Sequence, residues 1–261
     1  MQKEEIKFCD SNVFEGMTSI RAIIKAIDEG KSSRKITRIL FDKSRISKIA
    51  KEIGYFKAVL DKYGFELVET DAEELEKITL GTSHGGIVAI TTQREIPELT
   101  PDTSLPEFGF FAMIQGIEDP YNFGYALRSL YALGTDGIIL SKRNWMSAAG
   151  VVSRSSAGAS ELFDMYQGEP EEIVKIFKSH GYKIVCAEEK TENVLGECEL
   201  PLPILLIVGG EKRGISKAVL DMADLLVKID YGRDFNASLS AASATTIFAY
   251  EIARQNKNKP K

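Results

Sequence analysis

The chain has 261 residues, of which 44% are apolar and 27% charged, the balance of a globular protein with one large or two smaller domains. No run approaches the roughly 18 apolar residues that span a membrane, and the formal net charge of −5 excludes a chain that is basic throughout. Three cysteines without metal-ligand spacing and only two histidines give little support to a zinc site or a Ser-His-Asp triad. We therefore expect no metal, reduced thiols and a cytoplasmic location.

The N-terminal part, residues 1–95, alternates helix and strand patterns and predicts a small α/β sandwich. Apolar spacing predicts helices over 13–29, 46–62 and 71–80, and strands over 36–41, 65–69 and 85–91. We expect Asp71 to cap the third helix. His84 directly precedes the last strand, and we expect it to fix a turn rather than contact a ligand.

A basic cluster stands out in this first part. From Lys31 to Lys51 there are eight Lys and Arg residues against one acid, Asp42. Such a cluster can contact the phosphate backbone of a nucleic acid, or it can be a solvated helix face with its loop. The residues we expect to contact RNA are Arg34, Lys35 and Arg38.

Residues 96–107 carry three prolines and little periodicity, which predicts a linker. The C-terminal domain, residues 108–261, then alternates near-continuous apolar strands with helical patterns. This alternation predicts a parallel sheet covered on both faces, whose ligands bind beyond the carboxyl ends of the strands. The expected strands are 108–114, 137–140, 161–166, 183–188, 204–210 and 225–230.

The exit of the first of these strands reads "DPYNFGYALRSLYALG". Asp119 and Pro120 open a turn, and we expect Asn122 to cap the following helix. Gly124 lies in the first turn of that helix, with Arg128 on the same side one turn later. A helix N-terminus beside an arginine suits an anionic group such as an RNA phosphate, although a capped helix with a solvated arginine fits equally well.

The exit of the apolar strand 204–210 reads "GGEKRGIS". Gly209, Gly210 and Gly214 allow tight turning and a close approach of backbone to a ligand. The order of residues matches neither the dinucleotide fingerprint nor a Walker loop. Because Glu211 repels phosphates, a neutral or cationic ligand fits better, such as S-adenosylmethionine. A plain glycine-rich turn is the alternative.

The last stretch, residues 234–255, reads "DFNASLSAASATTIFAYEIARQ". Its first half consists mainly of small residues, and its second half has the pattern of an amphipathic helix. Small residues at the start of a helix indicate that a neighbouring element or a ligand packs there very closely.

Taken together, the three stretches resemble the three motifs of the SpoU (TrmH-like) RNA 2′-O-ribose methyltransferases, in the same order and spacing. The resemblance covers nearly the whole chain, since the N-terminal part looks like the ribosomal-protein-L30e-like substrate-binding domain of many members and ends in "HGGI", close to their "HQGV". It implies an α/β trefoil-knot (SPOUT) domain that binds S-adenosylmethionine, a homodimer formed through the knot region, and a structured RNA substrate, with rRNA favoured over tRNA.

The resemblance also assigns roles to individual residues. The implied catalytic residues are Asn122, Arg128, Glu211 and Ser238. The implied cofactor contacts are Leu140, Gly209, Gly210, Gly214, Ile229 and Leu239. The family links Arg128 to activation of the 2′-hydroxyl. Because a guanidinium stays protonated, we expect Arg128 to hold the adjacent RNA phosphate and to stabilise the developing alkoxide.

The third motif departs from the family pattern, which is close to S-L-N-V-S. Here it reads "SLSAA", with Ser240 in place of the family's Asn and Ala242 in place of its second serine. Asn236, four residues earlier, is a candidate to supply the missing amide. This departure keeps open a knot-fold RNA-binding protein without transferase activity. A tRNA-directed enzyme is a second alternative, and a doubly wound nucleotide-binding enzyme is disfavoured by the absent phosphate fingerprint.

Overall fold

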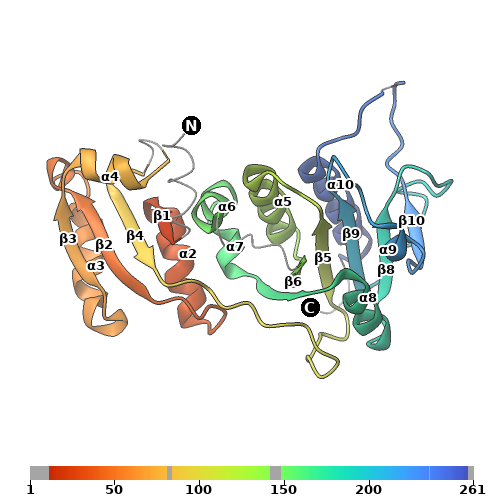
Figure 1. Cartoon of the computed structure of the whole chain (residues 1–261), viewed down its shortest axis with the longest axis horizontal. Coiled ribbons are helices and arrows are strands. Elements are labelled where there is room, and N and C mark those ends of the chain that lie inside the picture. The colour runs from red at the N-terminus through yellow and green to blue at the C-terminus, as the bar shows by residue number, and fades with distance from the viewer. Residues whose placement is uncertain (1–11, 81–83, 142–147, 235, 258–261) are drawn as a thin grey trace. The chain divides into compact units, whose positions relative to one another are not determined.

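The computed structural model describes residues 12–80, 84–141, 148–234 and 236–257, and Figure 1 labels most of its helices and strands. The chain forms two compact units. The first combines the N-terminal 95 residues with residues 144–162, and the second combines residues 96–143 with 163–261. None of the helices in the described ranges is long and apolar enough to cross a membrane.

The first unit is built on a four-stranded sheet of order β1-β4-β2-β3. Its strands are β1 (Val13–Glu15), β2 (Ile36–Asp42), β3 (Glu66–Thr70) and β4 (Ile87–Thr91). Its helices are α2 (Gly16–Asp28), α3 (Ala50–Tyr63), α4 (Ala72–Ile78), α6 (Ala149–Ser155) and α7 (Ala159–Leu162), with a 3-10 turn η1 (Lys43–Arg45). β2 and β3 are parallel, whereas β4 runs antiparallel to both β1 and β2. One apolar core joins α2 and α3 to this sheet.

Helices α6 and α7 belong to this first unit, although they fall within the range expected for the C-terminal domain. Arg34 Nε donates to Glu161 Oε2 of α7 at 2.9 Å, and the two side chains are only 1% and 4% exposed. Arg94 donates to the carbonyl oxygen of Ser160 at 3.1 Å. A buried ion pair and a buried side chain to backbone bond thus connect α7 to the N-terminal sheet.

The second unit is a six-stranded sheet of order β10-β8-β9-β5-β6-β7, and every neighbouring pair is parallel. The strands are β5 (Phe110–Gln115), β6 (Gly137–Ser141), β7 (Asp164–Gly168), β8 (Lys183–Ala187), β9 (Ile204–Gly209) and β10 (Leu225–Val227). The helices are α5 (Pro120–Ala132), α8 (Pro170–Ser179), α9 (Lys217–Leu220) and α10 (Ala241–Gln255). The predicted parallel sheet of an α/β fold is therefore confirmed, while the trefoil knot stays a prediction.

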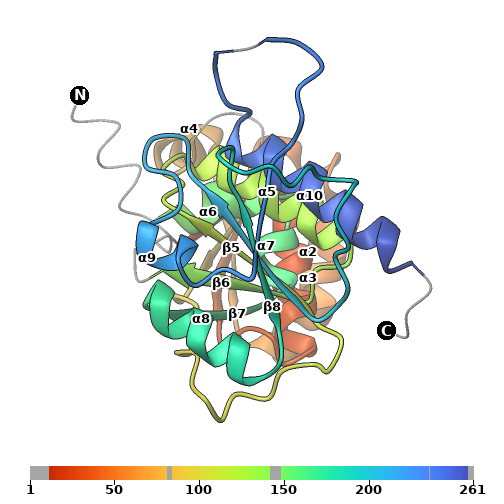
Figure 2. The same ribbon diagram turned by 90° about the vertical axis from the view of Figure 1, so that its right-hand side faces the viewer.

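Helices cover both faces of this sheet, as its apolar strands require. Figure 2 shows α5 and α10 side by side on one face and α8 and α9 on the other. Alternate residues of each strand serve each face. Phe111 and Met113 of β5, for example, pack with Phe177 of α8 in one buried cluster.

Four local predictions differ from the structure. Asp71 occupies the N-cap position of α4, but its side chain makes no capping hydrogen bond and pairs with Lys43 at 2.6 Å instead. Asp119, not Asn122, caps α5, because its side chain accepts the Tyr121 N–H and Pro120 occupies the first helical turn, where its missing N–H costs nothing. The strand expected over 161–166 begins only at Asp164, because Glu161 still belongs to the short helix α7. The first three residues of the helix expected over 13–29 form the strand β1, and the helix α2 begins at Gly16.

Candidate functional site

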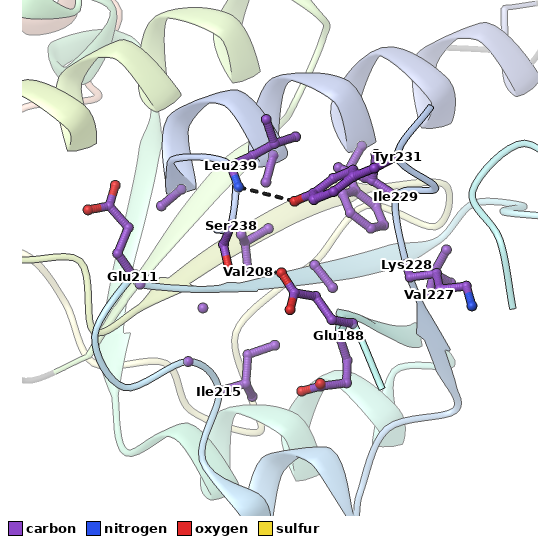
Figure 3. Close-up of a pocket in the computed structure, with 18 residues that line it drawn as sticks. Glu188, Val208, Glu211, Ile215, Val227, Lys228, Ile229, Tyr231, Ser238 and Leu239 are labelled. Carbon is purple, nitrogen blue, oxygen red and sulfur yellow. Dashed lines mark hydrogen bonds between the residues drawn. The ribbon is translucent and has the colours of Figure 1, made fainter. Parts of the chain in front are cut away.

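A cavity of about 220 Å³ lies at the carboxyl ends of β8, β9 and β10 (Figure 3). Val208 and Gly209 line it at the end of β9, and the start of α10 contributes Ala241 and Ala244. Ligands of parallel α/β sheets bind at this edge, so the cavity lies where the strand pattern predicts a site. It gathers residues of the second and third motifs.

The glycine loop after β9 is held tightly against β5. The Gly210 N–H donates to the Gln115 carbonyl at 2.7 Å, and the Gly214 N–H donates to the Gly210 carbonyl at 2.9 Å. A Cβ on Gly209 would lie 2.6 Å from the Gly214 carbonyl carbon, and Gly214 itself has φ +60°. Only glycine fits this double constraint of close backbone approach and left-handed conformation.

The Gln115 side chain completes this arrangement. Its Oε1 accepts the Ser216 N–H at 2.9 Å, and its Nε2 donates to Ser216 Oγ at 3.3 Å. Sequence reasoning missed Gln115. The signal available was one polar residue at the end of an otherwise apolar strand, directly before the first motif.

Carboxylates dominate the charges around the cavity. Glu188, Glu189 and Glu211 line it, with Lys228 as the one cation in the lining that the structure describes. Ser238 Oγ donates to Glu189 Oε1 at 2.8 Å. A negative lining favours a ligand that carries positive charge and hydroxyl or amino groups, and it disfavours a phosphate. This balance agrees with the expectation drawn from Glu211 alone.

Tyr231 is a further lining residue that sequence reasoning missed. The backbone N–H of Leu239 donates to the Tyr231 hydroxyl oxygen at 3.1 Å, the bond dashed in Figure 3. The contact fastens the third motif to the segment after β10. Ile229, on the same segment, lines the cavity as expected.

The small residues at the start of α10 have two neighbours. Ala241 and Ala244 line the cavity, and α10 packs along α5. Ser240 is the N-cap of α10, with its Oγ accepting the Ser243 N–H at 3.2 Å. Close packing of a neighbouring helix is therefore confirmed as one reason for the small residues, while packing against a ligand stays a prediction that the adjacent cavity supports.

The structure brings most of the expected site residues together. Gly209, Gly210, Gly214, Ile229 and Leu239, as well as Glu211 and Ser238, line the cavity. Asn122 Nδ2 donates to Glu211 Oε1 at 3.3 Å, which joins the first motif to the second. Arg128 is exposed on α5 outside the lining, and the side chain of Leu140 is buried on β6, away from the three strands that form the cavity.

Comparison with known proteins agrees with this geometry. Residues 109–250, more than half of the chain, match the family described as "SpoU rRNA Methylase family".

The chain belongs to the SpoU rRNA methylase family.

One relative is the 23S rRNA (guanosine-2′-O-)-methyltransferase RlmB of Shewanella oneidensis. It is 29% identical to this chain over 203 residues, which are 75% of this chain and 81% of the relative. The putative TrmH family tRNA/rRNA methyltransferase YacO of Bacillus subtilis is 24% identical over 88% of this chain and 92% of its own. The SpoU methyltransferase AviRb of Streptomyces viridochromogenes, solved with AdoMet, shares the fold with a TM-score of 0.75, 22% identity and coverage of 95% and 91%. The resemblance inferred from the three motifs is confirmed.

One expected RNA contact, Arg34, is wrong. Arg34 is 2% exposed, and its guanidinium is occupied by Glu161 and by the Thr92 carbonyl. Its positive charge serves the interior of the first unit. Lys35 and Arg38 are exposed and remain expected RNA contacts.

Proposed function

We propose that this chain transfers a methyl group from S-adenosylmethionine to a ribose 2′-hydroxyl of RNA, with ribosomal RNA as the substrate. The observation that carries the proposal is the cavity at the carboxyl ends of β8, β9 and β10, where the second and third motifs of a SpoU family chain meet. The RNA target follows from the relative that is named a 23S rRNA methyltransferase.

The lining of the cavity fits the proposed cofactor. Val208, Ile215 and Phe248 supply apolar walls for the adenine ring, and the carboxylates of Glu188 and Glu189 suit its hydroxyl, amino and sulfonium groups. When bound, S-adenosylmethionine supplies an electrophilic methyl group on sulfur. The glycine loop itself forms part of the cavity wall at the end of β9, through Gly209, Gly210 and Gly214.

Three side chains are expected to act on the RNA. Asn122 and Glu211 are hydrogen bonded to each other and orient the ribose. Arg128, exposed on α5, holds the neighbouring phosphate and stabilises negative charge on the 2′-oxygen as its proton leaves. Methyl transfer needs the 2′-oxygen held in line with the methyl donor, so positioning is the main demand on these side chains.

We expect the protein to act in the cytoplasm as a homodimer joined through the knot region. The first unit is expected to be the L30e-like RNA-binding domain, with Lys35 and Arg38 among its contacts.

The proposal is tested by calorimetry with S-adenosylmethionine and by transfer of a radioactive methyl group to an in vitro transcript of 23S rRNA. Arg128→Ala should abolish transfer and leave cofactor affinity nearly unchanged. Arg21→Ala, which removes an exposed arginine of α2, is the matched control and should transfer at the wild-type rate.

Absence of cofactor binding at millimolar concentration would contradict the enzyme proposal and favour an RNA-binding protein without transferase activity. Activity that survives in the Arg128 variant would show that the role of this residue is wrong. Mapping of 2′-O-methyl sites in rRNA and tRNA, from cells with and without the protein, identifies the modified nucleotide.

A further inference from the structure

The proposed reaction releases one proton that needs an acceptor. A ribose 2′-oxygen that becomes methylated gives up its hydrogen, and Arg128 cannot take it because a guanidinium stays protonated. Arg128 is also exposed on α5, outside the lining of the cavity at the carboxyl ends of β8, β9 and β10. The acceptor is therefore sought among the other polar side chains that line this cavity.

Three carboxylates line the cavity, and their contacts differ. Glu211 Oε1 accepts a hydrogen bond from Asn122 Nδ2 at 3.3 Å, in keeping with a role in orienting the ribose. Glu188 Oε1 accepts the backbone N–H two residues further on at 3.0 Å, which ties it to its own turn. Glu189 Oε1 accepts the hydroxyl of Ser238 at 2.8 Å. Glu189 is thus the carboxylate that is bonded to a hydroxyl.

A serine hydroxyl suits proton transfer because it has one O–H donor and two acceptor lone pairs. The O–H of Ser238 points to Glu189, so the oxygen is still able to accept a second hydrogen bond. Ser238, Glu189 and Glu211 line the same cavity. The carboxylate expected to orient the ribose and the pair that can take its proton therefore share one site.

The chain on the C-terminal side of Ser238 is anchored. The Leu239 N–H donates to the Tyr231 hydroxyl oxygen at 3.1 Å (Figure 3), and Ser240 is the N-cap of α10. Glu189 follows directly after the end of β8, on a segment tied to the sheet. Groups that transfer a proton need such fixed positions, because the transfer depends on a short and well-aligned hydrogen bond.

We propose that Ser238 and Glu189 form a proton relay for methylation of the 2′-hydroxyl, an inference that rests on the proposed function. The 2′-O–H bond breaks and its electron pair stays on the 2′-oxygen for the new bond to the methyl carbon. The released proton forms a bond with Ser238 Oγ, and the proton that Ser238 held moves to Glu189 Oε1. Serine is restored as a neutral hydroxyl, and Glu189, which is exposed, passes its proton to water.

Glu189→Gln separates proton transfer from positioning. The amide oxygen still accepts the Ser238 O–H, so the hydroxyl keeps its place, but the amide does not take up a proton. Single-turnover transfer to an in vitro transcript of 23S rRNA, at saturating S-adenosylmethionine, should slow by about 100-fold or more. Glu192→Gln removes an exposed carboxylate of the same segment outside the lining, and this matched control should keep the wild-type rate. If Glu189 only holds Ser238, both variants will have the wild-type rate.

Two further variants test the serine. Ser238→Ala removes the relay and should lose about as much rate as Glu189→Gln, whereas Ser238→Thr keeps a hydroxyl and should retain most of the rate. Because the members of a relay act as a unit, the double variant of Ser238→Ala and Glu189→Gln should be no slower than the slower single variant. A loss in the double variant equal to the product of the two single losses would show independent roles and overturn the relay.

The number of moving protons is a readout that a structural role does not affect. Two protons move in the relay, so the wild-type single-turnover rate in mixtures of H₂O and D₂O should follow a curve as the deuterium fraction rises. Transfer of one proton gives a straight line. A straight line for the wild type would overturn the relay and leave direct transfer to one acceptor.

Calorimetry with S-adenosylmethionine gives a readout that does not depend on turnover. Glu189→Gln removes one exposed charge, so its affinity for the cofactor should fall by about fivefold or less. A larger fall, with the wild-type rate at saturation, would make Glu189 a cofactor contact and overturn the relay. Lack of methyl transfer by the wild type would overturn the proposed function and the relay together, whereas a full rate in Glu189→Gln would overturn the relay alone.

Discussion

Gly210→Ala tests whether the close backbone approach in the glycine loop is essential. A Cβ on residue 210 would lie 2.3 Å from the Gly116 oxygen, 2.4 Å from the Gly116 carbon and 2.7 Å from the Ile117 nitrogen. All three are backbone atoms, so no side chain can rotate away and the loop or β5 must shift. Overpacking of this kind costs typically 1–3 kcal/mol.

The expected loss of stability is measurable by thermal unfolding. At roughly 2–4 °C per kcal/mol for a chain of this size, Gly210→Ala should lower the Tm by about 2–12 °C. Because Gly210 lines the cavity, the shift should also disturb the cavity wall, so the rise in Tm expected for the wild type with S-adenosylmethionine should be smaller in the variant.

Gly232→Ala is the matched control. A Cβ there meets no heavy atom within 4 Å, and Gly232 has no positive φ. The free energy of unfolding should therefore change by no more than about 0.5 kcal/mol, as is usual for surface substitutions, and the Tm should stay close to that of the wild type. If Gly210→Ala and Gly232→Ala have the same Tm and the same response to the cofactor, the loop does not need glycine at position 210 and the reasoning is refuted.

Three further predictions concern other parts of the chain. Glu161→Ala leaves the buried Arg34 charge unpaired and should cost about 3–5 kcal/mol in denaturant unfolding, and a loss below 1 kcal/mol would contradict the buried ion pair. Burial raises the pKa of the Cys186 thiol to about 12, so at pH 8 iodoacetamide should label Cys198 and spare Cys186 in the native protein; equal labelling by mass spectrometry would argue against this burial. Ser240→Ala should lose about 1 kcal/mol with the helix cap, whereas Ser240→Asn should keep it, and equal stability of the two variants would show that the cap is not needed.

Most of the sheet of the second unit could be predicted because most of its strands are short apolar runs that can be recognised locally, whereas β7 is largely polar and its start was predicted three residues too early. β9, Ile204–Gly209, is buried at five of its six positions, and the sequence there is almost wholly aliphatic. The place of α6 and α7 could not be predicted in this way. Their position depends on the pair of Arg34 with Glu161, which are 127 residues apart, and no local pattern reports such a partner.

The same distinction applies to the candidate site. Glycines at the end of a strand could be predicted to matter, because glycine is the default residue where the backbone must turn tightly or come close to another group. Gln115 and Tyr231 were missed because glutamine and tyrosine are ordinary residues whose roles here arise only from what they contact. Arg34 was assigned to RNA for a related reason, since a basic cluster does not reveal which of its members is turned inward.

The contacts of Ser240 show what the departure in the third motif, serine in place of the family's asparagine, does to the structure. Ser240 caps α10 through its Oγ, and asparagine is about as good a cap, so the exchange leaves the start of the helix intact. Asn236 is exposed and outside the cavity lining, which gives no support to the idea that it supplies the missing amide. One anchor of this motif is the Tyr231 hydroxyl, which accepts the Leu239 N–H from the segment after β10. The third motif is therefore positioned by a tyrosine outside it, and the position of its backbone does not depend on an asparagine within it.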